Sequence, residues 1–211
     1  AAVSELEAKG IKATGGSVDV TDGDGLKAWI TSAGEELGGI DILVSNAGAM
    51  AQGMDPKSWK QNFELDVLAA VNALEAAEPF LGKSADDKGD AAYVIISSIS
   101  AAVADQPGSY GPIKASLIHK AKGLARAHAK RGIRVNTVSP GMVYFEGGIW
   151  HMVEQNMPDF FKQAISRNPM DRCATPQEVA DAAVFLSSPV SAYTTGINLI
   201  VDGAVSNRVN F

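Results

Sequence analysis

Short, strongly apolar runs alternate along the chain with longer segments in which apolar positions recur every three to four residues. The short runs have the composition of β-strands and cover residues 17–20, 40–44, 93–97, 133–138 and 197–201. The runs at 40–44 and 93–97 are almost continuously apolar, which is typical of strands covered on both faces. We therefore predict a sheet that is buried between two layers.

The segments between the strands have the periodicity of amphipathic helices. Apolar residues recur at helical spacing in three of them: Leu26, Trp29, Ile30, Ala33 and Leu37; Trp59, Phe63, Val67, Ala70, Leu74 and Ala77; Ile113, Leu117, Ala121 and Leu124. A fourth helix should begin at Thr175, because Pro176 and Glu178 complete a capping box. Strands that alternate with helices predict parallel βαβ crossovers, and hence an α/β fold.

Residues 144–170 interrupt this alternation between the fourth predicted helix and the strand before it. The segment is rich in aromatic residues and methionine: Tyr144, Phe145, Trp150, Met152, Met157, Phe160, Phe161 and Met170. Such side chains suit an adaptable apolar pocket, so we interpret 144–170 as a substrate lid inserted into the domain. The alternative is an additional helix pair packed on the core.

Composition narrows the class of protein. A chain of 211 residues with 46% hydrophobic residues predicts one domain, 1–211, with a substantial core. The net charge of −6 argues against nucleic acid or an anionic membrane as partner, and no apolar run approaches the roughly 18 residues of a membrane span. The only cysteine, Cys173, cannot form an intrachain disulfide, which fits a reducing compartment, and we expect a cytoplasmic protein.

Metal and hydrolase chemistry find no support in the sequence. The three histidines are His119, His128 and His151, and none is spaced from another ligand as in a metal site. Ser109 lies between Pro107 and Gly111 and so lacks the nucleophile-elbow motif. We therefore predict no metal site and no serine hydrolase.

Tyr110 and Lys114 form the strongest candidate for catalysis. At spacing i, i+4 they share one face of a helix, and Pro112 is tolerated only if that helix has just begun. A nearby ammonium group and a positive helix end both favour phenolate, which lowers the pKa of tyrosine. A tyrosine so placed can act as a general acid or base at neutral pH.

Small and polar residues also follow three predicted strands. These stretches are Ser45-Asn46-Ala47-Gly48, Ser97-Ser98-Ile99-Ser100-Ala101 and Ser139-Pro140-Gly141. Open α/β sheets bind ligands at the carboxyl ends of their strands, where such residues can form the floor of a cofactor site.

With these motifs in this order, the chain resembles the short-chain dehydrogenase/reductase family. Further matching pieces are Asp19-Val20 and the ending Thr195-Gly196-Ile197-Asn198-Leu199-Ile200-Val201-Asp202-Gly203. The resemblance implies a Rossmann-like doubly wound sheet in three α/β/α layers, with strand order 3-2-1-4-5-6-7. It also implies an oxidoreductase that transfers a hydride between NAD or NADP and a secondary alcohol or ketone.

The resemblance also implies the roles of individual residues. Tyr110 would be the general acid/base, Lys114 would lower its pKa and hold the nicotinamide ribose, and Ser98 would bind the substrate oxygen, with Ser97 as the alternative. The other cofactor contacts would be Asp19, Val20, Asn46, Ala47, Gly48, Pro140, Gly141 and Val143. A small-molecule substrate and a homotetramer or homodimer would follow as partners.

Three departures from the family pattern stand out. The phosphate-binding motif T-G-x-x-x-G-x-G is absent, and Thr14-Gly15-Gly16 precedes a predicted strand instead of following one. The family's threonine four residues after Pro-Gly falls on Phe145. The family's catalytic asparagine, which holds a water that passes protons to the lysine, falls on Asp66.

Asp66 could hold that water and stabilise the Lys114 ammonium group, but its charge would oppose a Tyr110 phenolate. Alternatively, Asp66 points to solvent. These departures leave a second reading open, that of a non-catalytic family member used for binding or as a scaffold.

The resemblance implies that the chain begins in the helix before the family's third strand. We expect the first two strands to lie outside it and the natural polypeptide to be longer by some 40–50 residues. The strand at 17–20 would then lack a neighbour, and the strand at 40–44 would present an open apolar edge.

Overall fold

The computed structural model describes residues 2–104 and 106–209. In chain order its elements are α1 (Ala2–Glu7), α2 (Gly23–Leu37), β1 (Ile42–Ser45), α3 (Pro56–Asn62), η1 (Phe63–Leu68), α4 (Ala69–Lys88), β2 (Ala91–Ile96), η2 (Ile99–Ala101), α5 (Tyr110–His128), η3 (Ala129–Arg131), β3 (Ile133–Pro140), α6 (Ile149–Asn156), α7 (Pro158–Ser166), α8 (Pro176–Ser187), η4 (Pro189–Ser191) and β4 (Asn198–Val201).

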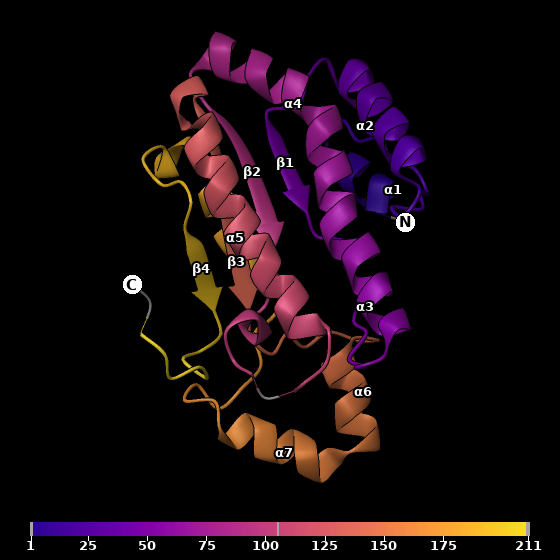
Figure 1. The fold of residues 1–211 in the computed structure, drawn as a ribbon, viewed down its shortest axis with the longest axis vertical. Coiled ribbons are helices and arrows are strands. Elements are labelled where there is room, and N and C mark those ends of the chain that lie inside the picture. Colours follow the sequence, from indigo (N-terminus) through magenta and orange to yellow (C-terminus); the bar gives the residue numbers. More distant parts are fainter. Residues whose placement is uncertain (1, 105, 210–211) are drawn as a thin grey trace.

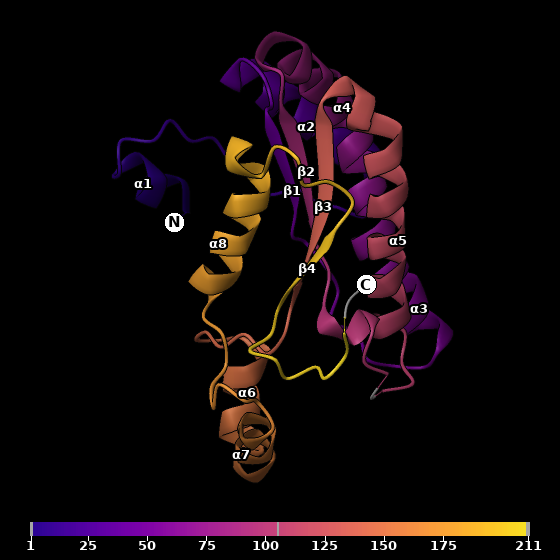
Figure 2. The ribbon, with the colours of Figure 1, turned by 90° about the vertical axis from the view of Figure 1, so that its left-hand side faces the viewer.

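The strands form one parallel sheet in the order β1-β2-β3-β4. Helices α2, α4 and α5 cover one face of the sheet, and α8 covers the other (Figures 1 and 2). This arrangement confirms the predicted α/β class with parallel crossovers and helices on both faces.

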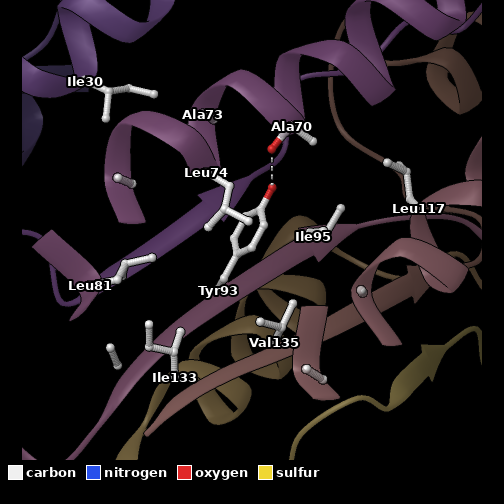
Figure 3. Close-up of a cluster of buried hydrophobic side chains, with 14 of the residues drawn as sticks. Ile30, Ala70, Ala73, Leu74, Leu81, Tyr93, Ile95, Leu117, Ile133 and Val135 are labelled. Carbon is white, nitrogen blue, oxygen red and sulfur yellow. Dashed lines mark hydrogen bonds between the residues drawn. The ribbon is translucent and has the colours of Figure 1, made fainter. Parts of the chain in front are cut away.

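Alternation along the strands gives each face its own core. Tyr93 and Ile95 of β2 pack under α4 and α5, whereas Val94 between them contacts the α8 side together with Val138 and Leu186. The Tyr93 hydroxyl donates to the Ala70 carbonyl across 3.1 Å (Figure 3). Burial raises the pKa of Tyr93 to about 12, so this strand holds a neutral phenol in its core.

One predicted strand does not form. Residues 11–19 have no regular structure, although Val18 and Val20 still pack against the α4 side of the core. A strand exists only where a neighbour supplies backbone hydrogen bonds, and no described strand pairs with 17–20. As expected, β1 is an edge strand, and it leaves Ile42 47% and Val44 45% exposed.

The predicted helix starts are confirmed at two important places. Helix α5 begins at Tyr110, and Thr175 and Glu178 form the capping box of α8. The N-terminal end of α5 therefore carries the candidate tyrosine, as the position of Pro112 indicates.

Residues 144–170 fold into the helix pair α6 and α7, beyond the carboxyl ends of the strands (Figure 1). Neither helix has a buried residue, so the pair does not extend the interior core. Its aromatic rings contact one another, with Trp150 stacked on Phe160 at a centroid distance of 6.4 Å.

Within 2–104 and 106–209 no helix combines the length and hydropathy that a bilayer crossing requires. In the same part of the chain, no three histidine, cysteine or acidic residues gather as metal ligands.

Candidate active site

A groove of about 1080 Å³ runs along the carboxyl ends of the strands and along α8. Its lining comes from the strand ends, from the start of α5 and from apolar residues of 143–152. The lining includes Asn46, Gly48, Ser97, Ser98, Tyr110, Lys114, Pro140, Gly141, Val143, Phe145, Trp150 and Met152. Lys114 is the one charged residue among the described residues of this lining. The groove is thus an apolar cleft with a small polar cluster at Tyr110.

The first turn of α5 brings Tyr110 and Lys114 together, as the i, i+4 spacing predicts. The Lys114 Nζ lies 5.6 Å from the centroid of the Tyr110 ring, and the residue is 5% exposed. The same Nζ donates to the carbonyl of Ile96 at the end of β2, across 3.3 Å. The ammonium group is therefore fixed between the phenol and the sheet.

The two candidate serines have different surroundings. Ser97 is buried, and its hydroxyl donates to the Lys114 carbonyl across 2.9 Å, which ties β2 to α5. Ser98 is half-buried, accepts from the amide of Ser100 across 3.1 Å and hydrogen-bonds the Tyr110 side chain. Because the Ser97 hydroxyl is already used within the fold, the geometry favours Ser98 as the contact to a substrate oxygen.

Asp66 lies in the π-helical turn η1, between α3 and α4. Single π-turns inside helices often occur at functional sites, because they redirect side chains. Asp66 is 3% exposed; its Oδ1 lies 2.5 Å from the Lys114 Nζ, and its Oδ2 accepts from the amide of Ala49 across 2.9 Å. These contacts exclude the alternative in which Asp66 points to solvent.

The surroundings of Tyr110 shift its pKa in opposite directions. Burial has the largest effect and raises the pKa of Tyr110. The hydrogen bond with Ser98 lowers this pKa, and the Asp66 carboxylate raises it. The result is a pKa above the usual value, which differs from the lowered pKa that Lys114 alone predicts. The main reason is burial, which disfavours the charged phenolate, and the Asp66 carboxylate, 2.5 Å from the Lys114 ammonium group, adds to it.

The residues expected to hold the cofactor divide into two groups. Asn46, Gly48, Pro140, Gly141 and Val143 line the groove together. Val143 is held there by a bridge to Ala174, and Gly141 by its amide, which donates to Val201 across 2.9 Å. Five predicted contacts thus meet beside Tyr110.

Asp19, Val20 and Ala47 lie outside that lining. The Asp19 carboxylate accepts from the amide of Thr21 across 2.9 Å and from its hydroxyl across 2.7 Å, which lowers the pKa of Asp19. Val20 packs against the core, and Ala47 is exposed beside the groove residues Asn46 and Gly48.

The groove fits the nicotinamide end of a dinucleotide. A Cβ at Gly48 would lie 2.8 Å from the Asp66 Oδ1 and 3.1 Å from the Lys114 Nζ, so only glycine leaves the cation accessible there. A Cβ at Gly141 would lie 2.9 Å from the Asp202 Cα. Small residues thus surround a buried ammonium group, which can donate to ribose hydroxyls.

Sequence reasoning missed two groups of residues at this site. Asn62 is fully buried and donates to the carbonyl of Ala51 and to the hydroxyl of Ser109, which precedes Tyr110. Ile149 and Ala180 bring α6 and α8 into the groove lining. Asn62 belongs to no motif, and the only available signal was a polar residue among the apolar positions of a helix.

Comparisons with known proteins identify the family of this chain. The family described as "Enoyl-(Acyl carrier protein) reductase" matches residues 1–206. Isoepoxydon dehydrogenase patN of Penicillium expansum is 34% identical over 202 residues, which cover 95% of this chain and 76% of that protein.

Solved structures agree as well. A putative short-chain dehydrogenase/reductase from Burkholderia xenovorans has a TM-score of 0.86 and 27% identity, over 99% of this chain and 81% of that one. The NADH-dependent reductase A1-R', responsible for alginate metabolism, has a TM-score of 0.82 and 26% identity, over 97% of this chain and 80% of that one. These relatives are enzymes and give no support to the scaffold alternative. The chain belongs to the short-chain dehydrogenase/reductase family and is an NAD(P)-dependent oxidoreductase.

Proposed function

We propose that the protein interconverts a hydrophobic secondary alcohol and its ketone, with Tyr110 as general acid/base. The observation that carries this proposal is the meeting of Tyr110, Lys114, Ser98 and Asp66 at one end of an apolar groove. When bound, NAD(P)H supplies a hydride to the carbonyl carbon.

In the direction of reduction, the Tyr110 hydroxyl donates its proton to the carbonyl oxygen, and Ser98 donates a hydrogen bond to the same oxygen. Lys114 binds the cofactor ribose and stabilises the phenolate that remains. Asp66 holds the Lys114 ammonium group in place, and solvent then returns a proton to Tyr110. Oxidation of the alcohol uses the same groups in reverse.

The chemistry of the groove lining supports an apolar, bulky substrate. Phe145, Trp150 and Met152 lie in the lining, and its one charged member among the described residues is Lys114, which we assign to the cofactor. The relative patN is named as an isoepoxydon dehydrogenase. Ketones of low polarity are the first compounds to assay here, because the groove lining is apolar.

A spectrophotometric assay tests this function directly. NADH and NADPH are each supplied with a panel of cyclic, aryl and straight-chain ketones and with a polar sugar as the control. We expect oxidation of the cofactor with the apolar ketones and little with the sugar. If fluorescence titration shows cofactor binding but every carbonyl is inert, the proposed reaction is wrong.

Three further proposals concern the whole protein. We assign residues 144–170 as a mobile substrate lid, because α6 lines the groove and neither α6 nor α7 has a buried residue. We also propose a homotetramer or homodimer and a cytoplasmic location. The acidic net charge of −6 and the single cysteine are consistent with that location.

A further inference from the structure

Asn62 is a buried amide that contacts two segments of the candidate active site. It ends α3, and its side chain is 0% exposed. Its Nδ2 donates to the Ala51 carbonyl across 2.8 Å and to the Ser109 hydroxyl across 2.7 Å. Both bonds come from Nδ2, and the buried Oδ1 has no hydrogen-bond partner among the described residues. Because an unpaired buried amide is costly, the two Nδ2 bonds define a specific contact rather than general packing.

The first contacted segment is the loop 46–53, which follows β1. At its start Asn46, Gly48 and Met50 line the groove. Asp66 binds the amide of Ala49 in the middle of this loop, and Asn62 binds the carbonyl of Ala51 further along it. The loop is thus held by two side chains of one continuous helical segment.

The second contacted segment is the turn before α5, which carries Tyr110. The amide of Ser109 donates to the Gly53 carbonyl across 3.1 Å. A Cβ at Gly108 would lie 2.1 Å from the Gln52 carbonyl oxygen, so glycine is required for this close approach. Asn62 joins the two segments, because its two hydrogen bonds end one on each.

We propose that Asn62 is a positioning residue, which sets Tyr110 relative to the groove loop 46–53. The inference rests on the proposed role of Tyr110. Asn62 and Asp66 are four residues apart on one face: Asn62 binds Ser109, which precedes Tyr110, and Asp66 binds Lys114. Proton transfer depends on placement, and a displacement of about 1 Å can lower the rate about a hundredfold.

The replacement Asn62→Leu tests this role against a matched control, Asn136→Leu. Asn136 is also 0% exposed and bonds the backbone of Thr194 and Ile197, and none of these three residues lines the groove. We expect both variants to unfold at lower temperature than the wild type. Only Asn62→Leu should lower kcat, by about 10- to 100-fold, with the substrate KM changed less than about threefold.

Hydrogen exchange supplies a measurement that does not depend on activity. The amide of Ser109 should exchange faster in Asn62→Leu than in the wild type, and at the wild-type rate in Asn136→Leu. If the wild type reduces none of the carbonyls, the proposed function fails. Separately, a Ser109 amide that exchanges at the same rate in Asn62→Leu as in the wild type would overturn the positioning contact. A kcat for Asn62→Leu equal to that of Asn136→Leu would also overturn it.

If Asn62→Leu does not fold, Ser109→Ala tests the same hydrogen bond by removing its acceptor. It also removes the longer bond of 3.4 Å that the Ser109 hydroxyl donates to the Ala51 carbonyl, and it leaves Asn62 bonded to Ala51. We expect a decrease in kcat in the same sense as for Asn62→Leu, with unchanged cofactor affinity. A wild-type kcat in Ser109→Ala would contradict the proposal.

Discussion

At the scale of single residues, burial has the largest effect on the ionisation of Tyr110, and the charges of Asp66 and Lys114 act beside it. Lys114 favours the phenolate, whereas burial and Asp66 favour the phenol and together outweigh it. Because the Asp66 Oδ1 is 2.5 Å from the Lys114 Nζ, no water fits between them. The water that the family resemblance places beside this lysine therefore cannot bridge these two atoms directly.

Replacing Tyr110 by Phe removes the proton donor and keeps the ring. We expect kcat to fall by about 10²–10⁴-fold, the usual cost of losing a general acid/base, with cofactor affinity within a few-fold of the wild type. Steady-state kinetics and cofactor fluorescence measure the two quantities. A variant with the kcat of the wild type would remove Tyr110 from the mechanism.

Replacing Asp66 by Asn removes a charge that raises the pKa of Tyr110. That pKa should fall, so the rising limb of alcohol oxidation, which needs phenolate, should move to lower pH. Ultraviolet difference spectra against Tyr110→Phe measure the same ionisation without turnover. Asp55→Asn is the control, because it deletes an exposed carboxylate and asparagine can still cap α3. Profiles of Asp66→Asn and wild type that overlay would show that Asp66 does not act on Tyr110.

At the scale of elements, local patterns predicted most of the fold. The strands at 40–44, 93–97, 133–138 and 197–201 correspond to β1–β4, because apolar runs of that length are stable only when covered on both faces. The run at 17–20 has similar composition but no described neighbour, and a pattern cannot supply one. Likewise, the i, i+4 spacing predicted that Tyr110 and Lys114 lie together on one helix face. The contacts of Asn62 depend on tertiary packing, which no local pattern encodes.

Arg134 joins β3 to the end of α8. It is 4% exposed, pairs with both oxygens of Asp90 at 2.7 and 3.0 Å, and donates to the carbonyls of Leu186, Ser187 and Ser188. Arg134→Met should lower the free energy of unfolding by about 3–5 kcal/mol, since it leaves buried acceptors unpaired.

Urea denaturation measures this loss, and Arg131→Met is the control. Arg131 is a half-exposed partner of Glu78, and its loss should cost about 1 kcal/mol or less. Equal midpoints for the two variants would show that Arg134 is no more important than a surface ion pair.

The helix pair α6–α7 should respond to ligands as one element. Exposed apolar side chains such as Met152, Met157 and Phe160 are 49–51% exposed, and Trp150 already lines the groove. Closure over an apolar substrate would bury part of this surface, so hydrogen exchange across 144–170 should slow when cofactor and substrate are both bound. Equal exchange with and without ligands would contradict the lid.

At the scale of the whole molecule, α3, η1 and α4 present a row of apolar side chains outside the core. Trp59, Phe63, Leu68 and Val71 are 37–45% exposed along this continuous helical segment. The family resemblance implies that the helix around Trp59–Phe80 and the segment 110–131 would pair with their copies, and that residues 205–211 would meet another subunit. Positions 210 and 211 of that last segment lie outside the described residues.

We therefore expect a homo-oligomer with two-fold interfaces, most readily a tetramer. Light scattering at micromolar concentration should give a mass of four or two chains. Phe63→Glu places a charge in the apolar row and should shift the protein toward smaller species, whereas Leu6→Glu, at an exposed apolar position of α1, should not. Phe63 is next to Asn62 in sequence, so its substitution can change activity without dissociating the protein. The activities of Phe63→Glu and Leu6→Glu are therefore compared at protein concentrations at which light scattering gives both variants the same mass. A wild-type protein that scatters as a monomer would contradict the interface.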